Sequence, residues 1–173
     1  MRKQNRLQLF LDAVVVAVVL FLDQFTKYLA IAHLKDKPAL VLAEGVLELC
    51  YLENTGTAFS MFRDQKFLIL AINFVVLGAI FFFLFRLPES RKYRLVHLLL
   101  AALSAGALGN IIDRIRFDYV VDFISFVLID FPVFNVADCF IVVATILLFL
   151  VFLFVLKEED LAFLKLSRQS ERE

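Results

Sequence analysis

The sequence predicts an all-α membrane protein with four transmembrane helices and a small extramembrane β-sheet on the outer face. Two observations support this fold class. Of the 173 residues, 62% are hydrophobic and 21 are phenylalanine, whereas a soluble domain is about half apolar. The chain also contains four apolar stretches of about twenty residues, the length that a helix needs to cross a bilayer. Its length fits a single integral membrane domain over residues 1–173.

The apolar stretches give the expected boundaries of the spans. We expect spans at about 8–33, 67–86, 94–112 and 136–156, with outer segments at 35–66 and 113–135. The first stretch follows a basic head, as the apolar core of a cleavable signal peptide does. Such a core is short, however, and this stretch contains charged residues, among them Asp23 and Lys27. A transmembrane helix is therefore the preferred interpretation.

Residues 35–66 have the composition of short strands and turns. Pro38 ends the first helix, because proline cannot continue one and restricts the residue before it. The β-branched and aromatic residues at 41–42 and 46–52 predict short strands with a turn at Gly45. This segment is expected to form a small sheet outside the membrane.

The distribution of basic residues predicts the orientation of the chain. The N-terminal head carries three basic residues and the short loop at 86–94 carries four, whereas those of the outer segments are spread over a much longer stretch. Cytoplasmic loops are enriched in lysine and arginine. Both termini are therefore expected in the cytoplasm.

Polar residues of this apolar chain gather at one depth. In this topology the first helix carries Asp23 roughly 24 Å beyond Leu7, near the outer edge of the bilayer core. The third span ends, and the fourth begins, at the same face. The polar residues expected there are Asp23, Asn110, Asp113, Arg114, Asp122, Asn135 and Asp138. Ionisable groups at membrane depth are costly, so this cluster is a candidate functional site.

Asp122 and Asp138 are the best candidates for chemistry within the cluster. Two facing carboxylates do not both ionise cheaply, so one keeps a proton and the other acts as a base. Such a pair can activate water and protonate a leaving amine, which is peptide hydrolysis by an aspartic mechanism.

Structural interpretations of the same residues also fit the sequence. They are a capping pair of Asn135 with Asp138, an i,i+4 salt bridge of Asp23 with Lys27, a helix-end ion pair of Asp113 with Arg114, a turn at Asn54–Gly56, and an interfacial position for His97. Two other protein classes stay open: a proton-coupled small membrane transporter, and a structural or assembly protein. A transporter would need a polar path to the cytoplasm, and the third and fourth spans show no polar stripe.

Other chemistries and partners find little support in the sequence. It contains no His-Glu-x-x-His, Gly-x-Ser-x-Gly or Cys-x-x-Cys motif, so no metal or other cofactor is expected. The formal net charge is zero and no basic run is present, so no nucleic-acid partner is expected.

The polar stretches occur in an order that resembles a known family. They are Asp23-Gln24-Phe25-Thr26-Lys27, the run from Glu53 to Ser60, the run from Gly106 to Arg114, Val120-Val121-Asp122-Phe123, and Phe134-Asn135-Val136-Ala137-Asp138. Together they resemble the bacterial lipoprotein signal peptidases, aspartic enzymes of the cytoplasmic (inner) membrane. The resemblance implies that Asp122 and Asp138 are catalytic. It also implies that Asp23, Lys27, Asn54, Gly56, Asn110, Asp113, Arg114 and Asn135 bind substrate or support the site.

The resemblance also implies a substrate and a location. The substrate is a prolipoprotein whose cysteine carries diacylglycerol, and cleavage falls just before that cysteine. The protein is then a multi-pass enzyme of the bacterial inner membrane, acting near the outer leaflet in contact with membrane lipid, and we expect a monomer. The apolar residues 123–134 fit a loop at the headgroup boundary. Thr57, Ala105 and Asp118 depart from the family pattern.

Overall fold

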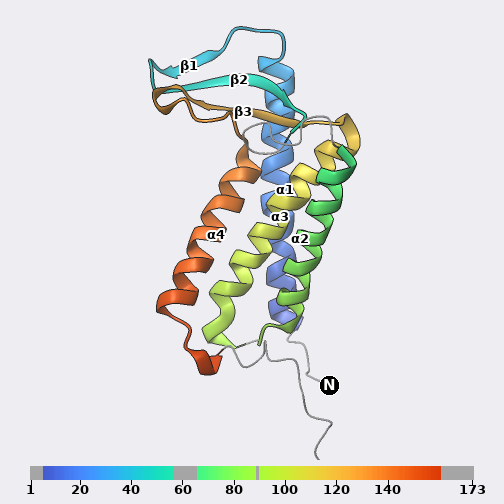
Figure 1. Ribbon diagram of the computed structural model, residues 1–173, viewed down its shortest axis with the longest axis vertical. Coiled ribbons are helices and arrows are strands. Elements are labelled where there is room, and N and C mark those ends of the chain that lie inside the picture. Colours follow the sequence, from blue (N-terminus) through green and yellow to red (C-terminus); the bar gives the residue numbers. More distant parts are fainter. Residues whose placement is uncertain (1–5, 57–65, 89, 161–173) are drawn as a thin grey trace, which may run out of the picture.

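Four long helices form a bundle, and a small β-sheet lies across one end of it (Figure 1). The computed structural model describes residues 6–56, 66–88 and 90–160. The helices are α1 (Arg6–Leu34), α2 (Lys66–Arg86), α3 (Arg94–Phe117) and α4 (Val136–Phe154), and a short 3-10 helix, η2 (Arg91–Tyr93), precedes α3. Within the described residues, four helices are long and apolar enough to cross a membrane. The predicted fold class is confirmed, while the placement of the sheet on the outer face stays a prediction.

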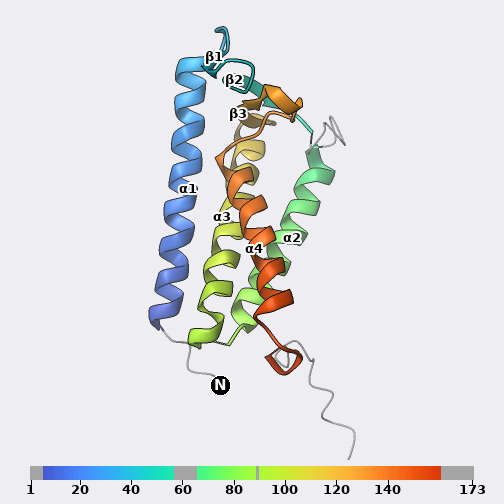
Figure 2. The same cartoon turned by 90° about the vertical axis from the view of Figure 1, so that its left-hand side faces the viewer.

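The helices run alternately up and down the bundle. Helices α1 and α3 end at the sheet, and α2 and α4 begin there, as Figures 1 and 2 both show. The start of α1 and the end of α4 therefore lie at the opposite end. This alternation brings the polar residues of α1, α3 and α4 to the end of the bundle that the sheet covers.

Helix α3 is longer than the sequence predicts. The predicted span ends at about residue 112, but the helix continues to Phe117 and ends at Asp118, which has a left-handed φ of 72°. The prediction stopped at the first charged residues, Asp113 and Arg114. Both side chains are buried and find polar partners on other elements, so the helix continues through them. They belong to the last turns of a helix and not to a loop.

Close approaches between helices centre on α3, which packs against each of the other three. Figure 2 shows α1 on one side of α3 and α2 on the other. A Cβ atom at Gly106 would lie 2.7 Å from the backbone oxygen of Ala137 on α4, and one at Gly109 would overlap the carboxylate of Asp23 on α1. Small residues let membrane helices approach closely. These two glycines bring α1 and α4 within reach of the polar residues of α3.

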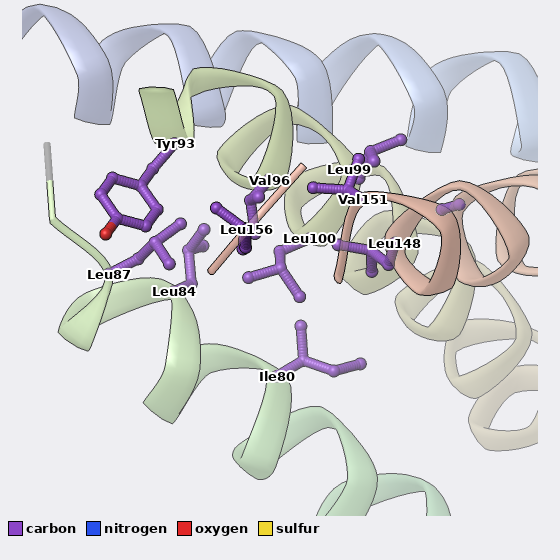
Figure 3. Close-up of a cluster of buried hydrophobic side chains, with 11 residues drawn as sticks. Ile80, Leu84, Leu87, Tyr93, Val96, Leu99, Leu100, Leu148, Val151 and Leu156 are labelled. Carbon is purple, nitrogen blue, oxygen red and sulfur yellow. The ribbon is translucent and has the colours of Figure 1, made fainter. Parts of the chain in front are cut away.

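The largest apolar cluster is formed where α2, α3 and α4 meet (Figure 3). It lies toward the end of α4 and the start of α3, the end of the bundle opposite the sheet in Figure 1. Its buried members are Ile80, Leu84, Leu87, Tyr93, Val96, Leu99, Leu100, Ala144, Leu148, Val151 and Leu156. Helix α1 contributes none of them. Apolar packing in this cluster thus holds α2, α3 and α4 together, whereas the buried apolar residues Ala30 and Leu34 of α1 pack against Val121 and Phe123 at the sheet.

The sheet has three antiparallel strands in the order β1 (Leu40–Ala43), β2 (Leu47–Asn54) and β3 (Val120–Phe126). The strands predicted before and after Gly45 are confirmed. Gly45 has a φ of 67°, a left-handed conformation that glycine adopts without steric cost.

The third strand was not predicted, because the sequence analysis treated 113–135 as an irregular outer segment. The partner of β3 is far away in the chain, so no hairpin signal marks it. In the structure Leu52 lies opposite Asp122, and Asn54 lies opposite Val120. This register brings the end of β2 beside one of the two candidate catalytic aspartates.

Candidate active site

The two candidate catalytic carboxylates are joined through one asparagine. Asp122 lies on β3 and Asp138 in the first turn of α4. The side-chain Nδ2 of Asn135 donates to Oδ1 of Asp122 at 2.6 Å, and its backbone N–H donates to Oδ2 of Asp138 at 3.2 Å. The Oδ1 atom of Asn135 accepts from the backbone N–H of Asp138 at 3.1 Å, which completes a capping box. The cap predicted from the sequence is confirmed, and the same residue also links the carboxylates.

Two further asparagines donate to the remaining carboxylate oxygens. Asn54 Nδ2 lies 2.7 Å from Oδ2 of Asp122, and Asn110 Nδ2 lies 2.8 Å from Oδ1 of Asp138. All four oxygens of the pair therefore accept a hydrogen bond. These bonds orient both carboxylates, and each oxygen keeps a second lone pair for water or substrate.

The two aspartates differ in their exposure. Asp122 is 1% exposed, whereas Asp138 is half-buried. Burial raises the pKa of Asp122 to about 6; the hydrogen bond from Asn54 opposes this rise, and the negative charge of Asp138 adds to it. A carboxyl group with this pKa holds a proton more readily than an ordinary aspartate does.

Arg114 supports the Asp122 side of the pair through a turn. Its guanidinium donates to the backbone oxygen of Gly56 at 3.0 Å, and the N–H of Gly56 donates to Oδ1 of Asn54 at 3.0 Å. The amide oxygen of Asn54 is thereby held, which leaves its Nδ2 facing Asp122. The turn predicted at Asn54–Gly56 is confirmed, and it belongs to the site.

A buried ion cluster adjoins the pair on the α1 side. The ammonium of Lys27 lies 3.1 Å from Oδ2 of Asp23 and 2.8 Å from Oδ2 of Asp113, and it donates to Oδ1 of Asn110 at 2.9 Å. The predicted i,i+4 bridge between Lys27 and Asp23 is confirmed. The ion pair of Asp113 is with Lys27 and not with Arg114, since successive helix residues do not face each other.

Gln24 is a residue of this cluster that the sequence analysis did not single out. Its Nε2 donates to Oδ2 of Asp23 at 3.1 Å and to Oδ1 of Asp113 at 3.0 Å. The other oxygen of Asp23 accepts from the backbone N–H of Ala137 at 3.1 Å, which ties α1 to the start of α4. The one signal for Gln24 in the sequence was its place inside the polar stretch 23–27.

The side chain of His97 faces the inside of the bundle, and its predicted interfacial position stays a prediction. Its side chain is 3% exposed, and its Nδ1 lies 3.0 Å from Oδ2 of Asp12 on α1. The other oxygen of Asp12 accepts from Gln8 at 2.8 Å. The partner of His97 is 85 residues away in the chain, and sequence spacing alone gave no indication of this contact.

Two of the three departures from the family pattern lie among the described residues. Asp118 is exposed at the end of α3, and Ala105 is fully buried inside that helix. Thr57 lies outside the described residues. Across the described part of the chain, no group of three or more His, Cys, Asp or Glu side chains is placed to hold a metal ion.

The helices and the buried carboxylates define a multi-pass membrane protein with a polar site at one end of its bundle. The family described as Signal peptidase (SPase) II matches residues 15–154. The chain belongs to this family of bacterial membrane proteases. This result disfavours both the transporter and the purely structural membrane protein.

Individual relatives and solved structures agree with this assignment. A lipoprotein signal peptidase of Caldanaerobacter subterraneus subsp. tengcongensis is 45% identical over 136 residues, which is 78% of this chain and 90% of the relative. A lipoprotein signal peptidase of Clostridium tetani is 35% identical over 152 residues, 86% of this chain and 94% of the relative. A solved structure of a bacterial membrane enzyme superposes with a TM-score of 0.75 at 27% identity and covers 94% of this chain and 93% of its own.

Proposed function

We propose that this chain is an aspartic endopeptidase that removes the signal peptide from diacylglyceryl-modified prolipoproteins, cutting just before the lipidated cysteine. The observation that carries the aspartic mechanism is the pair Asp122 and Asp138, joined through Asn135. Membership of the signal peptidase II family supports the reaction. The relatives named lipoprotein signal peptidase support the substrate class.

The unequal burial of the pair assigns a role to each member. Asp122 is the more buried, and its raised pKa suits it to hold the proton that the pair shares. Asp138 is the more exposed of the two and suits the role of the carboxylate that contacts water. This division is the arrangement of acid and base that peptide hydrolysis needs.

The reaction then follows in two steps that balance in protons. Asp138 takes a proton from water as the water oxygen bonds to the carbonyl carbon of the scissile peptide, while Asp122 gives its proton to the carbonyl oxygen. In the second step the C–N bond breaks, and the leaving amine receives the proton that Asp138 took. As the carbonyl re-forms, one of the two hydroxyls of the intermediate returns its proton to Asp122, and the other remains as the hydroxyl of the carboxylic acid, which restores the starting state of the pair.

The remaining candidate residues act by orientation in this proposal. Asn54, Asn110 and Asn135 donate directly to the pair. The groups that hold these asparagines or neutralise the buried charges are Asp23, Lys27, Gly56, Asp113 and Arg114.

The location of the site suits a lipid-anchored substrate. We place the sheet end of the bundle at the outer leaflet and the start of α1 and the end of α4 in the cytoplasm, as the basic residues predict. After β3, the short helix η3 (Val127–Ile129) and the following turn expose Leu128, Ile129 and Phe131 by 69%, 67% and 47%. Such residues fit the headgroup boundary, beside the diacylglyceryl chains. Since one chain supplies the whole cluster, a monomer suffices.

Cleavage by purified protein in detergent tests the proposed function. The substrate is a prolipoprotein with and without the diacylglyceryl group, and a chelator is present throughout. We expect cleavage of the lipidated form alone, at a rate that the chelator does not change. Equal cleavage of both forms would contradict the lipid requirement, and inhibition by the chelator would contradict the aspartic mechanism.

Substitution of each aspartate tests the pair directly. Asp122→Asn and Asp138→Asn keep the side-chain shape but cannot exchange the proton, so each should lower the cleavage rate by about 100- to 10,000-fold. Asp118→Asn changes an exposed carboxylate outside the cluster and should keep the wild-type rate. Near-normal cleavage by folded Asp122→Asn or Asp138→Asn would rule out the two-aspartate mechanism. Loss of activity in Asp118→Asn alone would assign the catalytic role to Asp118 instead.

A further inference from the structure

Lys27 is a cation buried next to the catalytic pair, yet the proposed reaction assigns it no direct part. It is 2% exposed. Its Nζ contacts three acceptors, namely Oδ2 of Asp23 at 3.1 Å, Oδ2 of Asp113 at 2.8 Å and Oδ1 of Asn110 at 2.9 Å. An ammonium has three hydrogens, so these contacts account for all of them. A lysine in this state has no donor left for a substrate.

The contact with Asn110 determines which way that side-chain amide faces. Its oxygen accepts from Lys27 and, at 3.2 Å, from Nδ2 of Asn135. Its nitrogen is thereby directed to Oδ1 of Asp138, 2.8 Å away. A reversed amide would set its oxygen against the carboxylate and its N–H groups against the ammonium, and both contacts would be repulsive.

We propose that Lys27 is a positioning residue for Asp138, which it orients through the amide of Asn110, and that it does not bind substrate. This inference rests on the proposed function, because it assumes that Asp138 is the catalytic base. The contacts run without a break from Lys27 on α1 through Asn110 on α3 to Asp138 on α4. The close packing of α1 on α3 at Gly109 keeps the distance between Lys27 and Asn110 short.

The charge of Lys27 gives the proposal a second measurable consequence. The positive charge lowers the pKa of Asp122, although less than burial raises it. Removing the charge should therefore move the pH dependence of cleavage that arises from Asp122 to higher pH. This shift reports the positive charge of Lys27, whereas a fall in kcat reports the orientation of Asp138 through Asn110.

Lys27→Met alone is a poor test, because it leaves Asp23 and Asp113 buried without their cation and threatens folding. Two double variants avoid this problem by removing one charge of each sign. In Lys27→Met/Asp113→Asn, the new amide keeps an oxygen that can accept from the backbone N–H of Val121, as Asp113 does now at 3.2 Å. In Lys27→Met/Asp23→Asn, the corresponding oxygen can still accept from the N–H of Ala137.

The experiment measures kcat, KM, the pH profile of kcat/KM and thermal unfolding for both double variants in detergent. We expect kcat to fall about 100-fold, as misplacement of a catalytic group does, with KM nearly unchanged and the pH profile moved upward. Lys27→Arg keeps the charge and should recover part of kcat with the wild-type pH profile. Lys35→Met removes an exposed lysine paired with Glu53 and should match the wild type.

Each outcome decides for or against the positioning role. Wild-type kcat and pH profile in a folded double variant would overturn it, and a raised KM with unchanged kcat would assign Lys27 to substrate binding instead. Failure of both double variants to fold would assign Lys27 to folding alone and would also overturn the proposal. Activity in Asp138→Asn would defeat the proposed function itself, whereas an inactive Asp138→Asn beside active double variants would defeat this inference only.

Discussion

The Nδ2 atom of Asn135 lies 2.6 Å from Oδ1 of Asp122, although Asn135 is also the residue that caps α4 and binds Asp138. The cap and the site are therefore the same structure. A capping box fixes the backbone and side chain of its first residue. The side chain of Asn135, fixed in this way, also holds the carboxylate of Asp122 on β3. The position of Asp122 relative to Asp138 consequently depends on how α4 begins.

Asn135→Ser separates the two roles of this residue. Serine keeps an oxygen that can accept from the backbone N–H of Asp138, but it has no N–H to donate to Asp122. We expect thermal stability close to wild type and a kcat lowered by about 10- to 100-fold. Asn135→Ala loses the cap as well and should cost about 1 kcal/mol more in the free energy of unfolding. A wild-type kcat in folded Asn135→Ser would show that its amide does not position Asp122.

Asp122 should make the stability of the protein depend on pH. Burial raises its pKa from 3.8 to about 6 in the folded protein. Between these values the folded protein binds more protons than the unfolded chain, so the free energy of unfolding falls as the pH rises from about 4 to 6. A difference of about two pKa units corresponds to about 3 kcal/mol. The free energy of unfolding, measured in detergent at pH 4 and pH 7, should show this loss in the wild type and not in Asp122→Asn. Equal pH dependence in the two proteins would contradict a role of Asp122 in it.

The same proton should control the rate of cleavage. If Asp122 gives its proton to the carbonyl oxygen, kcat/KM should fall about tenfold for each pH unit above about 6, since this parameter reports the free enzyme. The measurement is the initial rate on a lipidated substrate from pH 5 to pH 9, with the folded fraction followed in parallel. A flat profile over that range would mean that another group supplies the proton.

The sequence predicted the parts of this site that depend on local patterns. Runs of apolar residues located the four helices, and the position of Asp23 along its helix placed it at the same depth as Asn110. The chemistry of paired carboxylates then singled out Asp122 and Asp138, and the family resemblance implied the same two residues. The capping of α4 by Asn135 was also predictable, because a cap involves neighbours in the chain.

The contacts that the sequence did not predict join residues far apart in the chain. Strand β3 pairs with β2, which lies much earlier in the chain, and the partner of His97 lies on another helix. Gln24 could not be ranked above its neighbours, because only the fold shows that it reaches Asp113. Helix α3 extended past its predicted end, because burial of Arg114 against Gly56 depends on the tertiary structure.

Gly109→Ala tests the close approach of α1 and α3. The added Cβ would overlap the carboxylate of Asp23, so α1 must move away together with Lys27. We expect a loss of about 1–3 kcal/mol in the free energy of unfolding, as overpacking typically costs, and a lower kcat in the molecules that stay folded. Gly78→Ala is the matched control in α2, where a Cβ meets nothing within 4 Å, and it should leave kcat unchanged. Equal behaviour of the two variants would show that the contact at Gly109 can relax.

The pair of Asp12 and His97 predicts a contribution to stability that is separate from catalysis. Both side chains are buried, and their contact joins α1 to α3 at the end of the bundle away from the sheet. Asp12 lies about 16 Å along α1 from Asp23, so its loss should leave the catalytic pair in place. Because α1 has no part in the large apolar cluster, this polar contact should matter for holding α1 at that end.

A double-mutant cycle measures this contribution. Asp12→Leu leaves His97 and Gln8 without their acceptor, and His97→Leu leaves one oxygen of Asp12 without its partner, so each should lower the free energy of unfolding. The double variant leaves neither group behind, so its loss should be smaller than the sum of the two single losses by about 0.5–2 kcal/mol. Unfolding in mixed detergent micelles gives the three values, and kcat should stay within about twofold of the wild type in the folded double variant, as expected for distant sites. Additive losses would mean that the two side chains are not coupled, and a large fall in kcat would mean that this end of α1 also positions the catalytic aspartates.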